Sequence, residues 1–419
     1  MFRQGRLVGL GLTLTAVLFV LSACGDFFDV ENPTNLIDED LVTPQLEGTL
    51  STSAEGAMSG PLSRAVRFST ALGDQLWHPN VQDFGLNIDA GWRDRDNVLM
   101  DQIYDEMVSA AWIGDNMVER LTQMVANPAA HIGIADSYFW SGVALITAAG
   151  SFRAVTLNGG PPMTPAEAVE EALARFQSAA QVYGAAGNAN RRAAALGAAA
   201  RAHRSLFYEG KWFGSGENPA HFNQAETIAR QALGVHNDFL IEIRHGQPGS
   251  VNIIGVWDRE RITPWFYDIE DPVSGQRDPR IQHDPPAGSF QDGRIGTHPL
   301  VNRAKYGLQD PLEVSRAAEA ELIVAEARWL DDDMPGAVEF INRVRARSDL
   351  PPFSSDDPEE VWGQLMYERN VELFLEGRSW EDHMYYNIVP VLWAQVNKDV
   401  GVHHRWPVSA QERANNPNF

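Results

Sequence analysis

The start of the chain constrains its fold most, because it contains the single cysteine and so leaves the folded protein without disulfides. Arg3 and Arg6 precede the apolar run LVGLGLTLTAVLFV, and the residues LSA stand directly before Cys24. A basic end, a hydrophobic segment and small residues before a cysteine are typical of a lipoprotein secretory signal. Cys24 is also the only cysteine of the 419 residues. No internal disulfide can therefore form, and packing must hold the exported fold together.

Two other interpretations compete with a cleaved lipoprotein signal. The apolar run could be an uncleaved transmembrane helix, but residues 7–21 are fewer than the roughly 20 residues that a spanning helix needs. Cys24 could also be an ordinary buried cysteine. The position of Cys24 and the order of basic, apolar and small residues before it both fit a lipoprotein signal. Together they favour cleavage after residue 23 and lipidation of Cys24. We expect acyl chains on Cys24 to be the only contact with the membrane.

The charge of the chain argues against two classes of partner. The formal net charge is −23, and it becomes −25 once residues 1–23 are removed with Arg3 and Arg6. Phosphates of nucleic acids would be repelled, and so would an anionic lipid surface. Residues 24–44 are acidic and rich in turn formers. We interpret them as a tether that leads from the lipidated cysteine to a single domain of residues 45–419.

Helical periodicity covers most of this domain. Thr164, Pro165 and Glu167 form a capping-box pattern at one helix start. Successive helix pairs of about 34 residues are typical of tetratricopeptide-like units, although no unit matches the full repeat. The sequence therefore predicts a mostly α-helical solenoid of helix pairs. Helices are predicted over residues 45–72, 101–121, 133–150, 165–183, 191–208, 222–234, 311–330, 335–348 and 359–387.

Two long irregular excursions interrupt the helices, at residues 73–100 and 236–310. Both are rich in Gly, Pro, Asp and aromatic residues, which excludes long helices. Short strands are expected at 251–257 and 264–269. Loops on a rigid scaffold are where binding groups concentrate, so the excursions are the expected location of a ligand site.

The excursions combine indole and phenol rings with polar side chains. Sugars present C–H faces that pack on aromatic rings, and their hydroxyls need polar partners. The alternative is that these aromatic residues cover the core beneath the excursions. The candidate ligand-binding residues are Trp77, His78, Asn80, Trp92, Asp94, Arg95, Trp257, Trp265 and Tyr267.

One set of carboxylates could support catalysis. Glu368, Glu372 and Glu376 share a helix face, and paired carboxylates can hydrolyse glycosidic bonds. Three arginines are available to them as ion-pair partners: Arg345, Arg347 and Arg369. We interpret the glutamates as structural and expect no catalytic residue. No phosphate loop, nucleophile elbow or zinc motif occurs, so neither a metal nor a cofactor is expected.

Four C-terminal segments carry an ordered set of motifs. They are RAAEAELIVAEARW (316–329), INRVRARSDL (341–350), ERNVELFLEGRSWEDH (368–383) and WPVSAQERANNPNF (406–419). In order and spacing these segments resemble the SusD/RagB family of outer-membrane nutrient-binding lipoproteins, and the resemblance spans nearly the whole chain. Ser379 stands where the family usually has arginine, His383 where it has leucine, and Ser409 where it has proline. We assign these three departures to the scaffold.

The resemblance implies a SusD-like fold and a function. Such a protein would be lipid-anchored on the outer membrane and exposed at the cell surface. It would bind a nutrient, usually an oligosaccharide, and deliver it to a SusC-like TonB-dependent barrel without catalysis. Three alternatives stay open: an uptake lipoprotein that binds peptides, a lipid-anchored helical scaffold that assembles envelope proteins without a small-molecule ligand, and a glycosidase.

Overall fold

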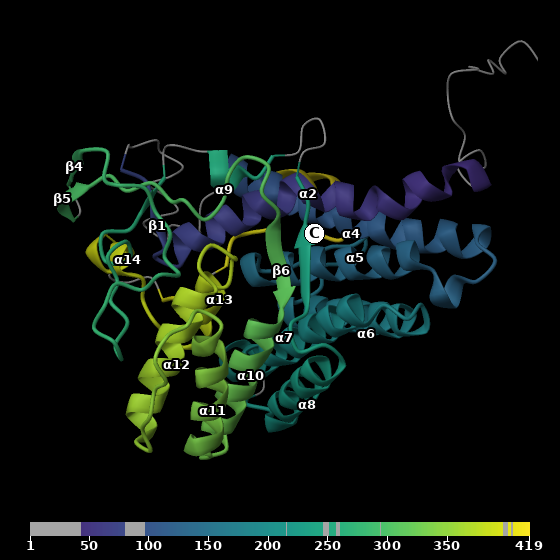
Figure 1. The fold of residues 1–419 in the computed structure, drawn as a ribbon. Coiled ribbons are helices and arrows are strands. Elements are labelled where there is room, and N and C mark those ends of the chain that lie inside the picture. The colour runs from purple at the N-terminus through teal and green to yellow at the C-terminus, as the bar shows by residue number, and fades with distance from the viewer. Residues whose placement is uncertain are drawn as a thin grey trace, which may run out of the picture. The chain divides into compact units, whose positions relative to one another are not determined.

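Helices that pack against their neighbours in the sequence build the scaffold (Figure 1). The computed structural model describes residues 43–79, 97–214, 216–245, 251–256, 260–293, 295–396, 401–403 and 405–419. The stack runs through α2 (Glu47–Leu72), α4 (Val98–Met124), α5 (Ile132–Ser151), α6 (Pro165–Ala185), α7 (Ala189–Phe213) and α8 (Pro219–Val235). The prediction of a mostly helical, tetratricopeptide-like arrangement is confirmed.

A second group of helices follows the second excursion. α10 (Ala317–Leu330) packs against α7 and α8, and α11 (Met334–Ala346) and α12 (Pro358–Glu372) pack against α10 and against each other. Short helices complete the unit: η2 (Pro44–Leu46), η3 (Pro128–Ala130), α9 (Ile253–Val256), α13 (Ser379–Tyr385), α14 (Val391–Val396) and α15 (Ala410–Asn415).

The helix α6 shows why the local sequence signals work here. The Glu167 backbone N–H donates to Thr164 Oγ1 at 3.3 Å, and the Thr164 N–H donates to Glu167 Oε2 at 2.7 Å. Pro165 occupies the first helical position, where its missing N–H costs nothing. The predicted capping box is therefore present and fixes the start of the helix.

The helices α5 and α7 lie in the core. Among the described helices, α5 alone is long and apolar enough to cross a membrane by composition, and 83% of its apolar window is buried. Such burial is typical of the core helix of a folded domain. In α7 the small residues Ala193–Ala195 and Ala198–Ala200 are buried, so α6 and α8 can approach it closely.

The structure contains three two-stranded antiparallel sheets among the described residues. They pair β1 (Leu76–Trp77) with β3 (Arg261–Ile262), β2 (Leu240–Ile243) with β6 (Leu312–Arg316), and β4 (Ser289–Asp292) with β5 (Gly296–Pro299). The strands predicted at 251–257 and 264–269 are wrong within the described residues. Asn252 Oδ1 accepts the Ile254 N–H at 3.1 Å at the start of the short helix α9. The Thr263 carbonyl accepts the Phe266 N–H at 3.0 Å and turns the chain.

Two predicted helices are shorter in the structure. The helix expected from residue 311 begins only at Ala317, because Leu312 and Val314 are buried in the strand β6 that pairs with β2. The helix expected over 359–387 is divided into α12 and α13. In the segment between α12 and α13, Leu375 has a φ angle of 60° and Gly377 one of 76°. A Cβ on Gly377 would lie 3.0 Å from Val66 Cγ2 of α2, so the reversal needs glycine there.

Residues Pro44–Phe419 form one compact unit. The signal segment, Cys24 and nearly all of the tether lie outside the described residues. Cleavage after residue 23 and lipidation of Cys24 therefore stay predictions.

Candidate functional site

The two excursions meet through the pairing of β1 with β3. Leu76 lies opposite Ile262, and the Thr263 hydroxyl donates to the Asp74 carbonyl at 2.6 Å. Leu76 and Ile262 are 186 positions apart, and neither strand has a neighbouring partner in sequence. The described parts of the two excursions therefore form one structural region beside α12 and α13 (Figure 1).

The structure buries the first two candidate residues of this region. Trp77 is fully buried and its indole N–H donates to the Ile262 carbonyl at 3.1 Å. His78 is also buried, and its Nε2 lies 3.2 Å from Glu260 Oε1. Burial alone would raise the pKa of Glu260, but the hydrogen bond from His78 and the charge of Arg67 lower it to about 2. Trp77 and His78 belong to the core here, so their predicted contact with ligand is not supported.

Trp265 lies in a different environment. It lines a cavity of about 310 Å³, which we call the Trp265 cavity. That volume is at the lower end of the 300–1,000 Å³ found for small-molecule sites. The indole N–H of Trp265 is buried and has no hydrogen-bond partner among the described residues. The cavity is also lined by Asp74, Tyr367, Asn370, Ser379 and His383, with Ile388, Val389 and Val391.

Tyr267, the other described candidate of the second excursion, does not line this cavity. The Tyr267 ring meets His283 edge to face, with centroids 5.9 Å apart. Five candidates lie outside the described residues, so the structure does not place them: Asn80, Trp92, Asp94, Arg95 and Trp257.

The walls of the Trp265 cavity carry neutral polar groups beside the carboxylates of Asp74 and Asp382. The Tyr367 hydroxyl donates to Asp278 Oδ2 at 2.7 Å, and burial and this carboxylate raise the Tyr367 pKa. Burial lowers the pKa of His383. Its Nδ1 lies 3.0 Å from the Ile388 carbonyl, which can only accept, so His383 donates to it. The Ser379 hydroxyl is buried without a partner among the described residues.

The rim of the Trp265 cavity is apolar and open. Ile388, Val389 and Val391 are among the most exposed large hydrophobic residues of the described chain. The Asp382 carboxylate at the cavity wall is held by Arg369 at 2.9 Å and by Arg204 at 2.8 Å. An aromatic face, an apolar rim and unpaired neutral donors suit an uncharged ligand with both C–H and hydroxyl surface.

Sequence reasoning missed most of these residues. We assigned Ser379 and His383 to the scaffold as family departures, and the structure places both on the cavity wall. The sequence carries little indication of this position, because the segment with Ser379 and His383 continues the apolar pattern of α12. Only the chain reversal at Leu375 and Gly377 turns α13 so that both residues line the cavity.

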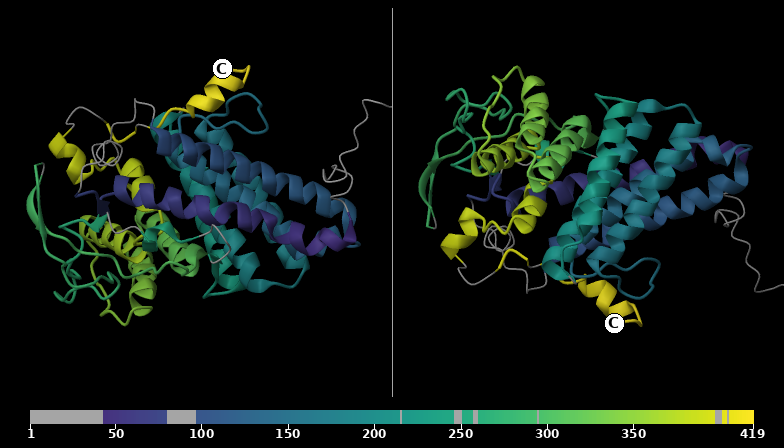
Figure 2. Two further views of the ribbon diagram at one scale, coloured as in Figure 1. Left: turned by 90° about the horizontal axis from the view of Figure 1, so that it is seen from above. Right: turned by 90° about the horizontal axis from the view of Figure 1, so that it is seen from below.

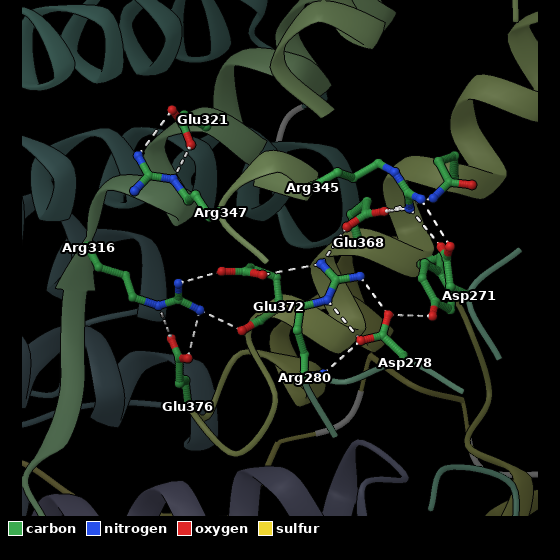
Figure 3. Close-up of polar contacts among 12 residues, drawn as sticks. Asp271, Asp278, Arg280, Arg316, Glu321, Arg345, Arg347, Glu368, Glu372 and Glu376 are labelled. Atoms are coloured by element: carbon green, nitrogen blue, oxygen red, sulfur yellow. Dashed lines mark hydrogen bonds and ion pairs between the residues drawn. The ribbon is translucent and has the colours of Figure 1, made fainter. Parts of the chain in front are cut away.

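The carboxylates that could have supported catalysis are held in ion pairs (Figure 3). Glu368 accepts from Arg280 and from Arg345, each at 2.6 Å. Glu372 accepts from Arg280 at 3.2 Å and from Arg316 at 2.7 Å. Both oxygens of each carboxylate therefore face guanidinium groups, and neither carboxylate has an oxygen left for a substrate.

Glu376 completes this row, and one of the three predicted arginine partners is correct. Arg316 bridges Glu372 and Glu376, at 2.8 Å from the latter. Arg345 pairs with Glu368 as expected. Arg369 instead pairs with Asp382, and Arg347 with Glu321 at 2.8 Å. The described residues contain no group of three His, Cys, Asp or Glu side chains that could hold a metal ion.

Buried carboxylates and histidines predict that acid destabilises the fold. Charged partners oppose burial and lower the pKa of Asp271 and Glu313 to about 2, as for Glu260. In the unfolded chain the pKa is 3.8 for Asp271 and 4.5 for Glu313 and Glu260. The three carboxylates therefore contribute fully to the free energy of unfolding above pH 4.5, and this contribution is lost as the pH falls through 2. Burial and His221 lower the pKa of His203 from 6.5 to about 4, so the fold loses further stability as the pH falls from 6.5 to 4.

Urea unfolding at pH 7, 5 and 3 measures this dependence. The unfolding midpoint is expected to fall at each step. A midpoint that stayed level from pH 7 to 3 would contradict the assigned ion pairs.

Comparison with known proteins supports the predicted resemblance. Residues 297–418 match the family model described as the SusD family. No curated protein sequence matches the chain significantly. A crystal structure of a SusD superfamily protein from Parabacteroides distasonis is similar, with a TM-score of 0.67 and 11% identity over 92% of this chain and 98% of that one.

Two further crystal structures share the fold. A SusD superfamily protein from Bacteroides vulgatus has a TM-score of 0.65 and 15% identity over 88% of this chain and 97% of that one. A SusD-like carbohydrate binding protein from Bacteroides fragilis has a TM-score of 0.55 and 17% identity over 76% of this chain and 79% of that one. The C-terminal region of this chain therefore matches the SusD family model, and the chain shares the SusD-like fold over most of its length.

Proposed function

We propose that this protein is a surface lipoprotein that binds an oligosaccharide in the Trp265 cavity and delivers it to a SusC-like TonB-dependent barrel. The observation that carries the proposal is the cavity itself, where a partly exposed indole meets neutral polar groups and an apolar rim. The similar carbohydrate-binding protein from Bacteroides fragilis adds support for the ligand class.

The chemistry of the cavity favours an uncharged sugar. A hexose ring can pack its C–H face on the Trp265 indole while its hydroxyls approach the cavity wall. The buried Trp265 N–H and Ser379 hydroxyl have no partner among the described residues. An unpaired buried polar group costs about 1–3 kcal/mol, so a sugar hydroxyl that pairs with either group recovers that energy on binding.

We also propose that the protein binds without catalysis. Glu368, Glu372 and Glu376 all pair with arginines, and their side chains are at most 8% exposed. A glycosidase needs one free carboxylate and one protonated carboxyl group facing the same bond. Turnover of an oligosaccharide that is abolished by Glu372→Gln would overturn this part of the proposal.

The first test replaces the indole that lines the cavity. Trp265→Ala is expected to weaken binding of the best oligosaccharide from a glycan screen by about 1–3 kcal/mol, as for an aromatic hot spot. Isothermal titration calorimetry measures the change. Tyr267→Ala is the matched control, because Tyr267 lies two residues away and outside the cavity. This variant should bind the oligosaccharide with wild-type affinity.

The same screen separates the alternatives. Binding of peptides in place of every glycan would favour a peptide-uptake lipoprotein. A protein that binds no small molecule but retains protein partners after mild solubilisation would favour an envelope scaffold. Purification in mild detergent without any large β-barrel protein would count against delivery to a transporter.

The second test addresses the anchor. Cys24→Ala removes the only thiol, so nearly all of the protein is expected to move from the membrane fraction to the soluble fraction, since acylation supplies the membrane affinity. Immunoblots of fractionated cells measure the distribution, with wild-type protein as the control. Unchanged membrane retention of the variant would refute the lipid anchor.

A further inference from the structure

A second hollow lies on the helical side of the molecule, away from the Trp265 cavity. It has a volume of about 530 Å³ and is formed by α4, the segment between α5 and α6, and α15. Figure 2 shows α15 beside that segment and apart from α12 and α13 in both views. We call this hollow the Trp112 groove. Its polar and aromatic lining is Asp105, Ser109, Trp112, Asn158, Gln411, Glu412 and Asn415.

Trp112 is the aromatic surface of the groove. It is 48% exposed, whereas Trp77, Trp393 and Trp406 are almost completely buried. One exposed aromatic residue is ordinary on a protein surface. Here, however, the indole stands in a hollow that is also lined by amide and carboxylate groups, the side chains that pair with hydroxyls.

The floor of the groove is fixed by the C-terminal segment. Glu412 Oε1 accepts from the Thr156 hydroxyl at 2.8 Å and from Asn416 Nδ2 at 2.7 Å. Asp105 Oδ1 accepts from the Ser409 hydroxyl at 2.6 Å. Each carboxylate is thus held through one oxygen. The other oxygens, Asp105 Oδ2 and Glu412 Oε2, take part in no hydrogen bond among the described residues and can accept from a ligand.

The amides above this floor are also available. The side chains of Asn158, Gln411 and Asn415 make no hydrogen bond within the described part of the chain, and all three are exposed. Asn158 adopts a φ of 56°, a left-handed conformation that asparagine tolerates better than most residues. The groove therefore offers a rigid pair of acceptors and three amides around one indole face.

We propose that the Trp112 groove is a second carbohydrate-binding surface, which takes an uncharged sugar unit stacked on Trp112. This inference rests on the proposed function for the ligand class but not on the Trp265 cavity. Asp105 and Glu412 accept hydrogen bonds from sugar hydroxyls and repel sulfated or uronate sugars. Burial and the neighbouring Glu412 raise the pKa of Asp105, as expected where two carboxylates line one hollow. A second surface on the same protein would hold a long glycan at two points and raise its avidity.

The test observes both sites in one experiment. The full protein is labelled with 5-fluorotryptophan, and Trp112→Phe and Trp265→Phe assign the two fluorine resonances. The protein is titrated with neutral gluco-, galacto-, manno- and xylo-configured hexasaccharides, and with a galacturonate hexasaccharide as the anionic comparison. The Trp112 resonance is expected to shift with at least one neutral hexasaccharide, equally in wild type and in Trp265→Phe, and not with the galacturonate.

Substitutions then test the lining. Trp112→Ala is expected to remove the second binding event in calorimetry, and Gln411→Ala to weaken it by roughly tenfold. Gln411 makes no side-chain hydrogen bond among the described residues, so unfolding in urea should be unaltered.

The outcomes for the two sites are separable. A Trp112 resonance that shifts while the Trp265 resonance stays fixed would support the groove and reject the Trp265 cavity. A Trp112 resonance that no neutral hexasaccharide moves, or that only the galacturonate moves, would overturn the groove whatever happens at Trp265.

Discussion

Replacing Arg345 by methionine is expected to lower the free energy of unfolding by about 3–5 kcal/mol, the usual cost of removing one partner of a buried ion pair. The Arg345 side chain is fully buried and lies 2.6 Å from Glu368 and 2.7 Å from Asp271. Both carboxylates are buried too, so the variant leaves two negative charges without this partner. Arg345 also donates to the Pro351 carbonyl at 2.7 Å, and so holds the segment that leads into α12.

Arg343 provides the control two residues away on the same helix. It pairs with Glu339 at 2.6 Å, but both side chains are about half exposed. Exposed pairs contribute little, so Arg343→Met should change the free energy of unfolding by about 0.5 kcal/mol or less. Urea unfolding of both variants measures the contrast. Equal effects from Arg345→Met and Arg343→Met would contradict the role given to the buried cluster.

A double variant sharpens this result. If the loss arises from uncompensated charge, Arg345→Met combined with Glu368→Gln should be less destabilised than the sum of the single variants. If the effects of the two single substitutions simply add, the lost stability arises from packing and not from uncompensated charge. The same comparison bears on function, because Tyr367 stands next to Glu368 on α12 and lines the Trp265 cavity.

Gly73→Ala is expected to destabilise the fold by about 1–3 kcal/mol, the range for overpacking, and to weaken ligand binding. A Cβ at Gly73 would lie 2.6 Å from the carbonyl carbon of Ser379. Backbone cannot yield as the end of a flexible side chain can, so α13 must move. Ser379 and the adjacent Asp74 line the Trp265 cavity, and their displacement changes its shape.

Gly56 in α2 is the matched control. A Cβ there would meet nothing within 4 Å, and alanine is favoured over glycine in a helix interior by about 0.5–1 kcal/mol. Gly56→Ala should therefore stabilise the protein slightly and leave its affinity unchanged. Urea unfolding and calorimetry are done on both variants. Wild-type affinity in Gly73→Ala would show that the contact with Ser379 does not shape the cavity.

The helices could be predicted because their signals are local. The capping box at Thr164 and the alanine run in α7 depend on residues within one or two helical turns of each other. The strand β6 was missed because its partner β2 lies about 70 residues earlier. The break after α12 was missed because Gly377 is required by its approach to Val66, a residue 311 positions away.

The candidate site was predictable only in part for the same reason. Trp77 and Trp265 look alike in sequence, since both stand in turn-rich segments. Pairing of β1 with β3 buries Trp77 beneath the excursion, whereas the turn after Thr263 leaves Trp265 at a cavity. Residues near the two tryptophans do not determine the difference, because the strand that covers Trp77 and the helices that complete the cavity at Trp265 lie far along the chain.

Sugar binding in the Trp265 cavity is tested most directly by a crystal structure of the protein with the neutral oligosaccharide that it binds best. A sugar ring is expected to pack on the Trp265 indole inside the cavity, with hydroxyls hydrogen-bonded to Trp265 Nε1 or Ser379 Oγ. An empty Trp265 cavity in crystals that hold the saturating ligand elsewhere would contradict this expectation.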